Sequence, residues 1–420
     1  MIATAIYNTG IQLYQAGVRL AAVMGKEKAV RWLKGRQDWR LRMQEAGVGS
    51  GPVVWIHAAS LGEFEQGRPV LEAIREQFPA YKILLTFFSP SGYEVRKNYP
   101  GADYIFYLPL DTARNARDFL DMAKPALAIF IKYEFWYHFL TELHIRKIPT
   151  LLVSGIFRPG QVFFKGYGGM FRRLLQQLTH IFVQNEESLQ LLEQIGLQQV
   201  SISGDTRFDR VAALLHETRT LPQVTQFAGE ARLLVAGSTW PEDEQLLADW
   251  WLKNRPAGVK LIIAPHEIHE SHIRSISNLF PDTITWSALS KGAVSDAGVL
   301  IIDNVGMLTT LYRYAHIAYV GGGFGKEGIH NILEPAVYGK PVLIGPEYSR
   351  YFEAVTLVAL QGALVVAGAG DFTRYVQELL GQPAFYGHTA AVAGEYVAAS
   401  KGATDKVLHY IQENRFLSRE

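Results

Sequence analysis

The chain has 420 residues, 48% of them hydrophobic, and a formal net charge of only +1. This length predicts two domains of ordinary size, each with its own hydrophobic core. The absence of cysteine excludes disulfides, thiolate nucleophiles and cysteine-based zinc sites, and the near-neutral charge argues against broad nucleic-acid binding. Any catalysis must therefore use carboxylates, histidines, lysines or backbone dipoles.

The first 46 residues are the most basic part of the chain, with eight Lys/Arg, three Asp/Glu and a net charge of +5. We expect residues 1–46 to form a helical segment lying on a membrane surface, because cations, Trp32 and Trp39 follow an apolar stretch that is too short for a bilayer span. A helix packed on the body of the protein is the alternative. A cleaved signal peptide is not expected. The apolar residues near one helical face are Ile2, Ile6, Leu13, Leu20 and Met24.

Short β-type runs alternate with helix-length segments along most of the chain, which predicts parallel sheets covered on both faces. The first series of predicted strands is 53–57, 82–87, 104–107, 127–131, 150–153, 180–183 and 200–202. The second series is 233–236, 260–264, 299–302, 317–320, 341–344 and 363–366. We therefore predict two Rossmann-like domains, at 47–210 and 211–395, followed by a helix at 396–420.

The first polar cluster follows the predicted strand 53–57, where the sequence reads HAASLGE before a helix-like stretch. Ligands of open parallel sheets bind outside the carboxyl ends of the strands, so Glu63 lies where a functional group is expected, and Gly62 leaves room for close approach. The helix dipole also favours a carboxylate at a helix start. Capping and catalysis explain Glu63 equally well at this point.

The second cluster is KYEFW, after the predicted strand 127–131. Glu134 is an acid among aromatic residues, where burial is costly without a partner or a task. From the residues alone, a salt bridge from Glu134 to Lys132 or to an arginine is the better explanation.

In the second domain, GSTWPEDE follows the strand 233–236 and predicts a helix capped by Ser238 or Thr239 with Pro241 in its first turn. That geometry would also present N–H groups to an anion. Pro265 and His266 end the strand 260–264, and His266 is a candidate ligand contact, although a lone histidine is more often structural. The acids and histidines at 266–272 lack the HExxH order, so zinc is not predicted.

The glycine-rich stretch GGGFGKEGIHNILEP follows the strand 317–320 and matches neither a Walker loop nor a first-strand GxGxxG motif. Asn331 is predicted to cap a helix running to about 338, with phosphate over its N-terminus and Glu334 accepting the hydroxyls of a ribose. A glycine-rich turn that merely packs tightly is the alternative.

Taken together, the ordered motifs resemble those of the lipid A Kdo transferases, which move 3-deoxy-manno-octulosonic acid (Kdo) from CMP-Kdo to the lipid A precursor. The resemblance covers nearly the whole chain, and only the ordered set is specific: HAASLGE, YEFW, GDTRFD, GSTWPEDE, APHE, DNVGML, GGGFGKEGIHNILEPA and GKPVLIGP. It implies a GT-B architecture, with two Rossmann-like domains facing across a cleft. It also implies attachment to the cytoplasmic face of the inner membrane.

The resemblance also implies roles for particular residues. Glu63 is similar in position to the family's general base, and Glu134 to a second functional carboxylate. Acceptor contacts are expected at Ser60, Gly62 and Arg158. The segment 154–158 and Lys132 depart from the family's pattern. The residues expected to bind the nucleotide donor are Ser238, Thr239, Pro265, His266, Gly306, Met307, Gly322, Gly323, Asn331 and Glu334.

The expected reaction is a direct, inverting displacement on CMP-Kdo by a hydroxyl of the glucosamine disaccharide. The sequence offers no DxD-type metal pair, so we expect transfer without a metal or another cofactor. Two alternatives remain open at this stage: a sugar-nucleotide epimerase of the same architecture, and a membrane-attached nucleotide-sugar binder without catalytic activity.

Overall fold

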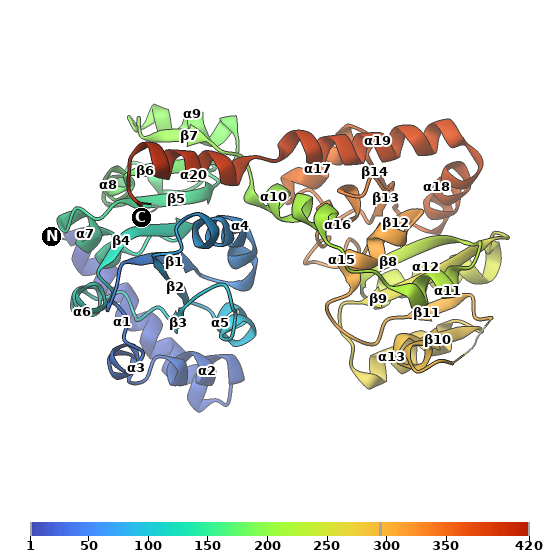
Figure 1. Cartoon of the computed structure of the whole chain (residues 1–420), viewed down its shortest axis with the longest axis horizontal. Helices are drawn as coiled ribbons and strands as arrows, with labels where there is room; N and C mark the ends of the chain where they lie inside the picture. The colour runs from blue at the N-terminus through green and yellow to red at the C-terminus, as the bar shows by residue number, and fades with distance from the viewer. Residues whose placement is uncertain (1, 294–295, 419–420) are drawn as a thin grey trace. The chain divides into compact units, whose positions relative to one another are not determined.

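The computed structural model describes residues 2–293 and 296–418, and the chain divides into two compact units (Figure 1). The N-terminal unit comprises Met1–Arg210 and Lys401–Glu420, and the C-terminal unit comprises Val211–Ser400. Each unit contains one seven-stranded sheet. All the strand pairings described are parallel, as the alternation of strands and helices predicts.

The N-terminal sheet contains all seven strands that the sequence predicts for it. In sheet order they are β3 (Tyr104–Tyr107), β2 (Lys82–Phe87), β1 (Val53–Ala58), β4 (Pro125–Ile131), β5 (Thr150–Gly155), β6 (His180–Val183) and β7 (Val200–Ile202). The helices that follow these strands are α4 (Leu61–Gln77), α5 (Pro90–Arg96), α6 (Ala113–Ala123), α7 (Tyr137–Ile145), α8 (Gly169–Gln177), α9 (Glu186–Gln194) and α10 (Thr206–Ala213). A 3₁₀ turn, Val162–Phe164, precedes α8.

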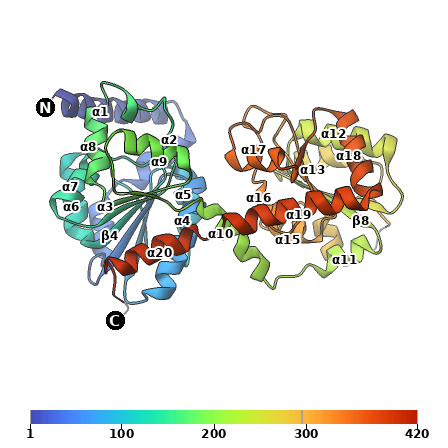
Figure 2. The ribbon, with the colours of Figure 1, turned by 90° about the horizontal axis from the view of Figure 1, so that it is seen from above.

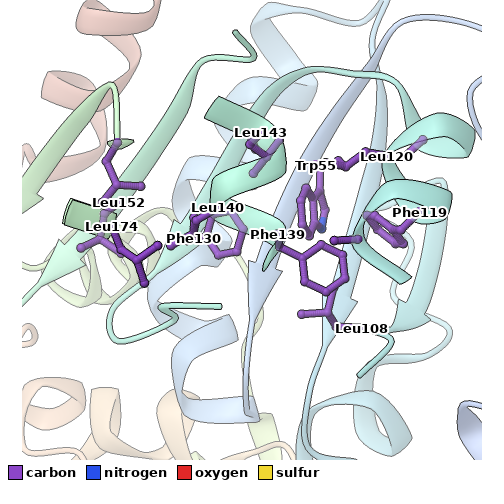
Figure 3. Close-up of a cluster of buried hydrophobic side chains, with 14 of the residues drawn as sticks. Trp55, Leu108, Phe119, Leu120, Phe130, Phe139, Leu140, Leu143, Leu152 and Leu174 are labelled. Carbon is purple, nitrogen blue, oxygen red and sulfur yellow. The ribbon is translucent and has the colours of Figure 1, made fainter. Parts of the chain in front are cut away.

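Alternate residues of β1 face opposite sides of this sheet, and each side has its own core. Trp55 packs with Phe119, Phe130 and Phe139 on the side covered by α6 and α7 (Figure 3). Val54 and its alternate neighbours pack on the other side, against α4 and the last helix. Because β1 is buried on both faces, its carboxyl end is held rigidly.

Three helices precede the sheet: α1 (Ile2–Val23), α2 (Glu27–Gly35) and α3 (Trp39–Glu45). One side of α1 packs on the unit, since Tyr7 Oη donates to Asp111 Oδ2 at 2.5 Å. Its other side is apolar and exposed. The side chains there that the structure describes are Ile6 (68% exposed), Leu13 (67%) and Leu20 (63%), with Met24 (68%) just past the helix end. The side chain of Ile2, placed on the same face by the sequence, lies outside the described residues.

The expectation that Trp32 and Trp39 flank a membrane-facing stretch is wrong. Their side chains are only 5% and 7% exposed, because Trp32 packs on Tyr14 and Phe88 while Trp39 packs on Phe119. Within the described residues, no helix combines the length and the hydropathy needed to cross a bilayer.

The C-terminal sheet contains the six predicted strands and one more. In sheet order they are β10 (Thr283–Thr285), β11 (Val299–Ile301), β9 (Val259–Pro265), β8 (Arg232–Thr239), β12 (Ile317–Val320), β13 (Val342–Ile344) and β14 (Ala363–Val365). The strand missed by the sequence analysis is β10, a three-residue edge strand with the sequence TIT, which is too short to show a periodic pattern. The core on one face is built around Trp250, Trp251, Tyr319 and Phe372.

The helices of this unit lie before, between and after its strands. They are α11 (Pro222–Ala228), α12 (Pro241–Asn254), α13 (Glu270–Leu279), α14 (Trp286–Ser290), α15 (Leu308–Tyr314), α16 (Leu333–Ala336), α17 (Phe352–Ala359), α18 (Ala369–Gly381) and α19 (Pro383–Ser400), with a 3₁₀ turn at Leu214–His216. The last helix, α20 (Ala403–Glu413), belongs to the N-terminal unit and lies against α4 (Figure 2).

One carboxylate fastens the start of α20. Asp209 of α10 accepts hydrogen bonds from Gly402 N (2.5 Å), Thr404 N (2.7 Å) and Thr404 Oγ1 (2.7 Å). Two of these donors are backbone groups at the helix N-terminus, which has no intrahelical acceptors for them. Asp209 therefore replaces a local cap, and it joins the two points where the chain passes between the units.

We predict that Asp209→Ala destabilises the docking of α20 by about 3 kcal/mol, because three charge-assisted hydrogen bonds are lost. Hydrogen exchange of the α20 amides should become about a hundredfold faster. The matched control is Asp405→Ala, which removes an exposed carboxylate from the first turn of the same helix. Equal exchange in the two variants would contradict the role of Asp209.

Candidate functional site

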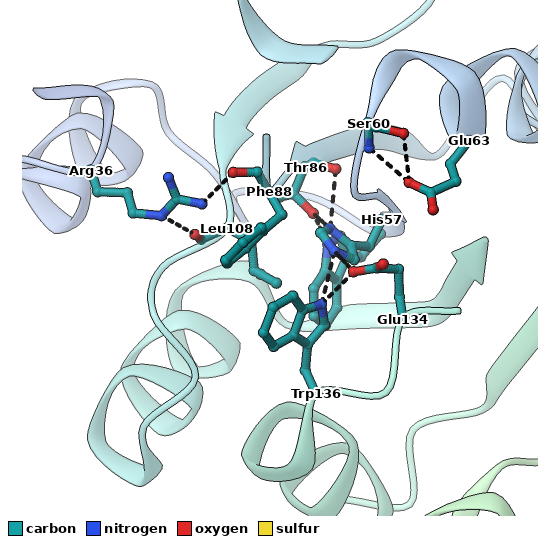
Figure 4. A network of polar contacts seen from close by, with 10 residues as sticks. Arg36, His57, Ser60, Glu63, Thr86, Phe88, Leu108, Glu134 and Trp136 are labelled. Carbon is teal, nitrogen blue, oxygen red and sulfur yellow. Dashed lines mark hydrogen bonds and ion pairs between the residues drawn. The ribbon is translucent and has the colours of Figure 1, made fainter. Parts of the chain in front are cut away.

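The Glu63 carboxylate lies in the first turn of α4, directly after the carboxyl end of β1. Its Oε2 accepts from Ser60 N at 2.8 Å and from Ser60 Oγ at 2.9 Å (Figure 4). Glu63 and Ser60 thus form the capping box that the sequence leaves open as one explanation. Both capping bonds end on Oε2, so the cap itself does not use Oε1.

The surroundings of Glu63 alter its acidity. Burial raises the pKa of Glu63 above its usual value of 4.5, and the charge of Glu134 raises it further, while Ser60, Lys132 and His57 act in the opposite direction. Gly62, next to it, is exposed, and no atom lies within 4 Å of the place a Cβ would take. The Glu63 carboxylate is therefore half-buried, with an open approach beside it.

The Glu134 carboxylate is 8% exposed and follows β4. Its Oε2 accepts from Trp136 Nε1 at 2.7 Å and lies 3.0 Å from His57 Nε2 (Figure 4). His57 is the next-to-last residue of β1, the strand paired with β4. Neither contact is predicted from the sequence, which favours a salt bridge from Glu134 to Lys132 or to an arginine.

A chain of donors leads from the core to Glu134. Trp55 Nε1 donates to Thr86 Oγ1 at 2.8 Å, and Thr86 Oγ1 lies 2.8 Å from His57 Nδ1. If the threonine hydroxyl donates to Nδ1, the N–H at His57 Nε2 donates a hydrogen bond to Glu134. Thr86 Oγ1, both ring nitrogens of His57 and Glu134 Oε2 then have partners, and two donors orient this carboxylate oxygen.

The remaining residues of the N-terminal motifs lie either near Glu63 or in structural contacts away from it. Burial raises the pKa of the Tyr133 hydroxyl. The exposed Arg158 lowers this pKa and the half-buried Glu63 raises it, so both charges act on the same hydroxyl. The GDTRFD motif is structural: Asp205 pairs with Arg207 at 2.7 Å and accepts from Gln66 of α4 at 3.2 Å.

In the C-terminal unit, the predicted cap of α12 is wrong. Strand β8 continues through Ser238 to Thr239, and the N-cap is Trp240, whose backbone N–H donates to Asp243 Oδ2 at 2.9 Å. Thr239 is buried and donates to Glu244 at 2.9 Å. The strand runs on because β8 pairs with β9 up to Pro265 through a register shift.

The fully buried Asp243 also organises the glycine-rich loop. It accepts from Gly322 N at 2.9 Å and from Tyr319 Oη at 2.5 Å, and burial raises its pKa while these donors lower it. Gly322 has a φ of +94°, and a Cβ there would lie 2.5 Å from Gly328 O. The amide of Gly322 is thus occupied by a protein carboxylate instead of being free for a phosphate.

Tight packing also explains Gly323, whose backbone abuts Gly345 so closely that a Cβ would lie 2.6 Å from its Cα. The N-cap of α16 is Ile332, so the predicted cap at Asn331 is wrong by one residue. The Asn331 side chain still reaches the helix start: its Oδ1 accepts from Leu333 N at 3.2 Å, and its Nδ2 donates to Glu334 Oε1 at 3.1 Å. The helix, however, ends at Ala336 instead of about 338, because the chain turns at Gly339 with a φ of +59°.

Three aromatic rings stack beside this loop. His266, exposed at the end of β9, lies 4.6 Å from Trp240 and 4.5 Å from His330 between ring centroids. Burial, with a smaller effect of His266, lowers the pKa of His330 to about 4, so His330 is neutral at pH 7 and accepts from Trp240 Nε1 at 3.1 Å. Sequence reasoning missed Trp240 and His330, although both lie within the quoted motifs.

Three other residues predicted to bind the nucleotide donor lie at or next to the ends of β9 and α15. Pro265 is the buried last residue of β9, and Met307 is the buried N-cap residue of α15. Gly306 is exposed with a φ of +83°, and its carbonyl accepts from Arg219 at 2.9 Å. The described residues contain no group of three or more His, Asp or Glu side chains placed to hold a metal ion.

Comparison with known proteins identifies the family. A family profile described as 3-Deoxy-D-manno-octulosonic-acid transferase (kdotransferase) matches residues 36–210. The 3-deoxy-D-manno-octulosonic acid transferase of Chlamydia trachomatis serovar A is 30% identical over 325 residues, which cover 74% of this chain and 74% of that protein. The chain belongs to the Kdo transferase family. The transferase of Rickettsia bellii is 25% identical over 84% of this chain and 86% of its own, and that of Aquifex aeolicus 26% identical over 74% and 80%.

Solved structures agree on the fold of this Kdo transferase family member. The UDP-GlcNAc 2-epimerase from Neisseria meningitidis bound to UDP-GlcNAc superposes with a TM-score of 0.60 and 16% identity, covering 86% of this chain and all of that one. At that identity the likeness concerns the fold alone. It confirms the predicted GT-B class, with two Rossmann-like domains in one chain.

We predict that Asp243→Ala loosens the glycine-rich loop, because Gly322 N, Trp240 N and Tyr319 Oη lose their common acceptor. Trypsin should then cut after the exposed Lys326, within this loop, at least about tenfold faster. Glu242→Ala, which removes an exposed acid from the same first turn of α12, is the control and should leave the rate unchanged. Equal cutting rates would contradict the loop-holding role of Asp243.

Proposed function

We propose that this protein transfers Kdo from CMP-Kdo to the glucosamine disaccharide of the lipid A precursor, with Glu63 as the general base. One observation supports this more than any other: Glu63 is half-buried at the carboxyl edge of the sheet, and its pKa is raised by burial and by Glu134. A carboxylate with a raised pKa is a stronger base at any pH where it is still ionised.

In the proposed step, a primary hydroxyl of the disaccharide attacks the anomeric carbon of Kdo while its proton passes to Glu63. The bond from the anomeric carbon to the CMP phosphate breaks, and CMP leaves with the electron pair. Ser60 orients the carboxylate through Oε2, and the open space at Gly62 admits the sugar. Such a base contributes about 10² to 10⁴-fold to the rate.

In the proposed mechanism, the charge of Glu134 raises the pKa of Glu63. His57 and Trp136 hold its carboxylate in place, so that its charge stays near Glu63. We place Arg158 with the acceptor's anionic groups, because it is exposed and acts on the same hydroxyl of Tyr133 as Glu63 does.

We place CMP-Kdo on the C-terminal unit, near the strand ends that carry Pro265, His266 and Met307. The stacked rings of Trp240, His266 and His330 form a flat surface suited to a pyrimidine base. Glu334, positioned by Asn331, is suited to accept the hydroxyls of the ribose. We propose that the transfer proceeds without a metal.

We also propose that the protein works at the cytoplasmic face of the inner membrane. The acceptor is an acylated lipid, and the exposed apolar residues of α1, together with the net charge of +5 over residues 1–46, suit a surface of anionic lipid. Deleting residues 1–24 should release the protein from sedimenting vesicles.

Incubation with CMP-Kdo and lipid A precursor separates this proposal from its rivals. The proposal requires a new glycolipid and an equal amount of CMP. An altered sugar nucleotide without glycolipid would indicate an epimerase, and binding without any product would indicate a non-catalytic carrier. Either of the latter results would overturn the proposed reaction.

Glu63→Gln should lower kcat by about 10² to 10⁴-fold, because glutamine has no basic carboxylate. Glutamine at this position still completes a capping box with Ser60, so the start of α4 should stay folded. Affinity for CMP should be unchanged, since Glu63 belongs to the other unit. The control is Glu76→Gln, an exposed acid on the same helix. A kcat near that of the wild type in folded Glu63→Gln protein would rule out the proposed base.

The acidic limb of the kcat/KM profile should lie above 4.5, the usual pKa of glutamate, because the base must be ionised and its pKa is raised. Activity should fall as pH drops through that raised pKa. In Glu134→Gln the limb should move to lower pH, since one negative charge that raises the pKa of Glu63 is removed. A limb that stays in place would show that Glu134 does not act on the titrating base.

A further inference from the structure

A groove of about 520 Å³ lies in the N-terminal unit, between α1, α2 and the loop that follows β2. Its size falls within the range of small-molecule sites, about 300–1,000 Å³. The walls are mainly apolar and are formed by Tyr14, Val18 and Ala21 of α1, Trp32 of α2, and Phe88 and Pro90. None of these side chains belongs to the strand-end clusters described above.

The groove exists because α1 presents small residues to it. Tyr14, Gly17, Val18 and Ala21 share one face of the helix, at the i, i+3, i+4 and i+7 spacing. At Gly17 no atom lies within 4 Å of the position of a Cβ, so the space in front of it is open. A larger residue there would extend into the groove.

The wall opposite is rigid. Trp32 and Phe88 stack edge to face at 5.7 Å, and Tyr14 packs on both, at 5.8 Å and 5.9 Å. Arg36 locks this arrangement: its guanidinium lies 3.8 Å from the Trp32 ring centre and donates to Phe88 O at 2.7 Å (Figure 4). The groove is therefore preformed, which lowers the entropic cost of filling it.

This wall continues to the carboxylates. The ring of Phe88 lies 4.5 Å from that of Trp136, and Trp136 Nε1 donates to Glu134 (Figure 4). The aromatic wall that begins at Trp32 thus reaches the ring that contacts Glu134. The side chain of Trp32 also has a buried indole N–H with no hydrogen-bond partner among the described residues. The linkage oxygen of an acyl chain is an acceptor of the kind that this donor lacks.

Charge and exposure indicate what kind of molecule enters. Lys26 and Lys28 line the groove and are exposed. The neighbouring face of α1 presents Leu13 and Leu20, which are 67% and 63% exposed. Cations beside an apolar groove and an apolar helix face suit an anionic amphiphile at a membrane surface.

We propose that this groove binds one acyl chain of the anionic glycolipid acceptor, with Lys26 and Lys28 near its charged end. The inference rests on the proposed function, and it makes the acyl chain part of substrate recognition instead of only an anchor in the bilayer. The continuity of the wall with Glu134 favours the acceptor over a bulk phospholipid.

The test variant is Gly17→Leu, which fills the groove. Its matched control is Gly10→Leu, because Gly10 lies two turns earlier on the same helix, is equally exposed, has no atom within 4 Å of a Cβ and does not line the groove. Both changes replace a helical glycine by the same good helix former, so they alter helix propensity equally. Circular dichroism and thermal melting check that both variants fold.

Kdo transfer is measured in detergent with two acceptors, the acylated precursor and its fully deacylated disaccharide. Gly17→Leu should raise the KM for the acylated acceptor about tenfold or more, as expected when buried methylene contacts are lost. The KM for the deacylated acceptor should not change, and Gly10→Leu should match the wild type with both. An unchanged KM for the acylated acceptor, or an equal rise for both acceptors, would overturn the proposal.

Two binding measurements complete the test. An acceptor brominated on its acyl chains should quench tryptophan fluorescence in the wild type and in Gly10→Leu, less in Gly17→Leu, and less in Trp32→Phe. Sedimentation with vesicles of anionic phospholipid should be the same for both glycine variants. Loss of sedimentation only in Gly17→Leu, with an unchanged KM in detergent, would assign the groove to membrane phospholipid and reject the acceptor. If the wild type shows the quenching but transfers no Kdo, the proposed function is wrong, whereas the assignment of the groove to an acyl chain is still supported.

Discussion

The pairing of β1 with β4 is the constraint on which the proposed catalytic site depends. It brings two carboxylates, from separate motifs, to the same edge of one sheet, where burial and their mutual repulsion raise the pKa of Glu63. Such an arrangement costs free energy unless the charges are partly compensated. His57 and Trp136 compensate Glu134, and Ser60 compensates Glu63, through bonds to fixed elements of the same sheet edge. The buried core on both sides of β1 holds these groups in place.

The two units contain the same local contact at a helix start, in different surroundings. In each, an acid three residues after the N-cap accepts the N-cap backbone N–H: Glu63 from Ser60 at 2.8 Å, and Asp243 from Trp240 at 2.9 Å. Glu63 is half-buried and open to solvent at Gly62, so one of its oxygens lies outside the cap. Asp243 is fully buried and uses both oxygens to hold Trp240, Gly322 and Tyr319. The same position therefore leaves one carboxylate oxygen outside the cap in the N-terminal unit and holds the glycine-rich loop in the C-terminal unit.

The N-terminal helices combine packing with exposure. Tyr7 and Tyr14 fix α1 to the unit, while Leu13 and Leu20 remain exposed on a neighbouring face. Arg36 links this helical layer to the loop after β2, whose Phe88 ring leads to Trp136. The helical layer that carries the exposed apolar face of α1 is thus connected to the carboxylates through one aromatic wall.

Much of the fold followed from the sequence alone, because buried strands and the helices between them are encoded in local patterns of apolar residues. Among the residues that the structure describes, these patterns located each strand except the short β10, and they placed Glu63, Glu134 and His266 after strand ends. Only the tertiary structure decided which groups meet. The order of strands in the sheet pairs Glu134 with His57, and the return of the loop after β12 brings the amide of Gly322 to Asp243. The sequence likewise predicts Trp32 and Trp39 as interfacial residues, whereas in the structure both side chains are buried by packing. Hydrogen bonds and burial of this kind depend on residues far apart in the chain, and no local spacing specifies them.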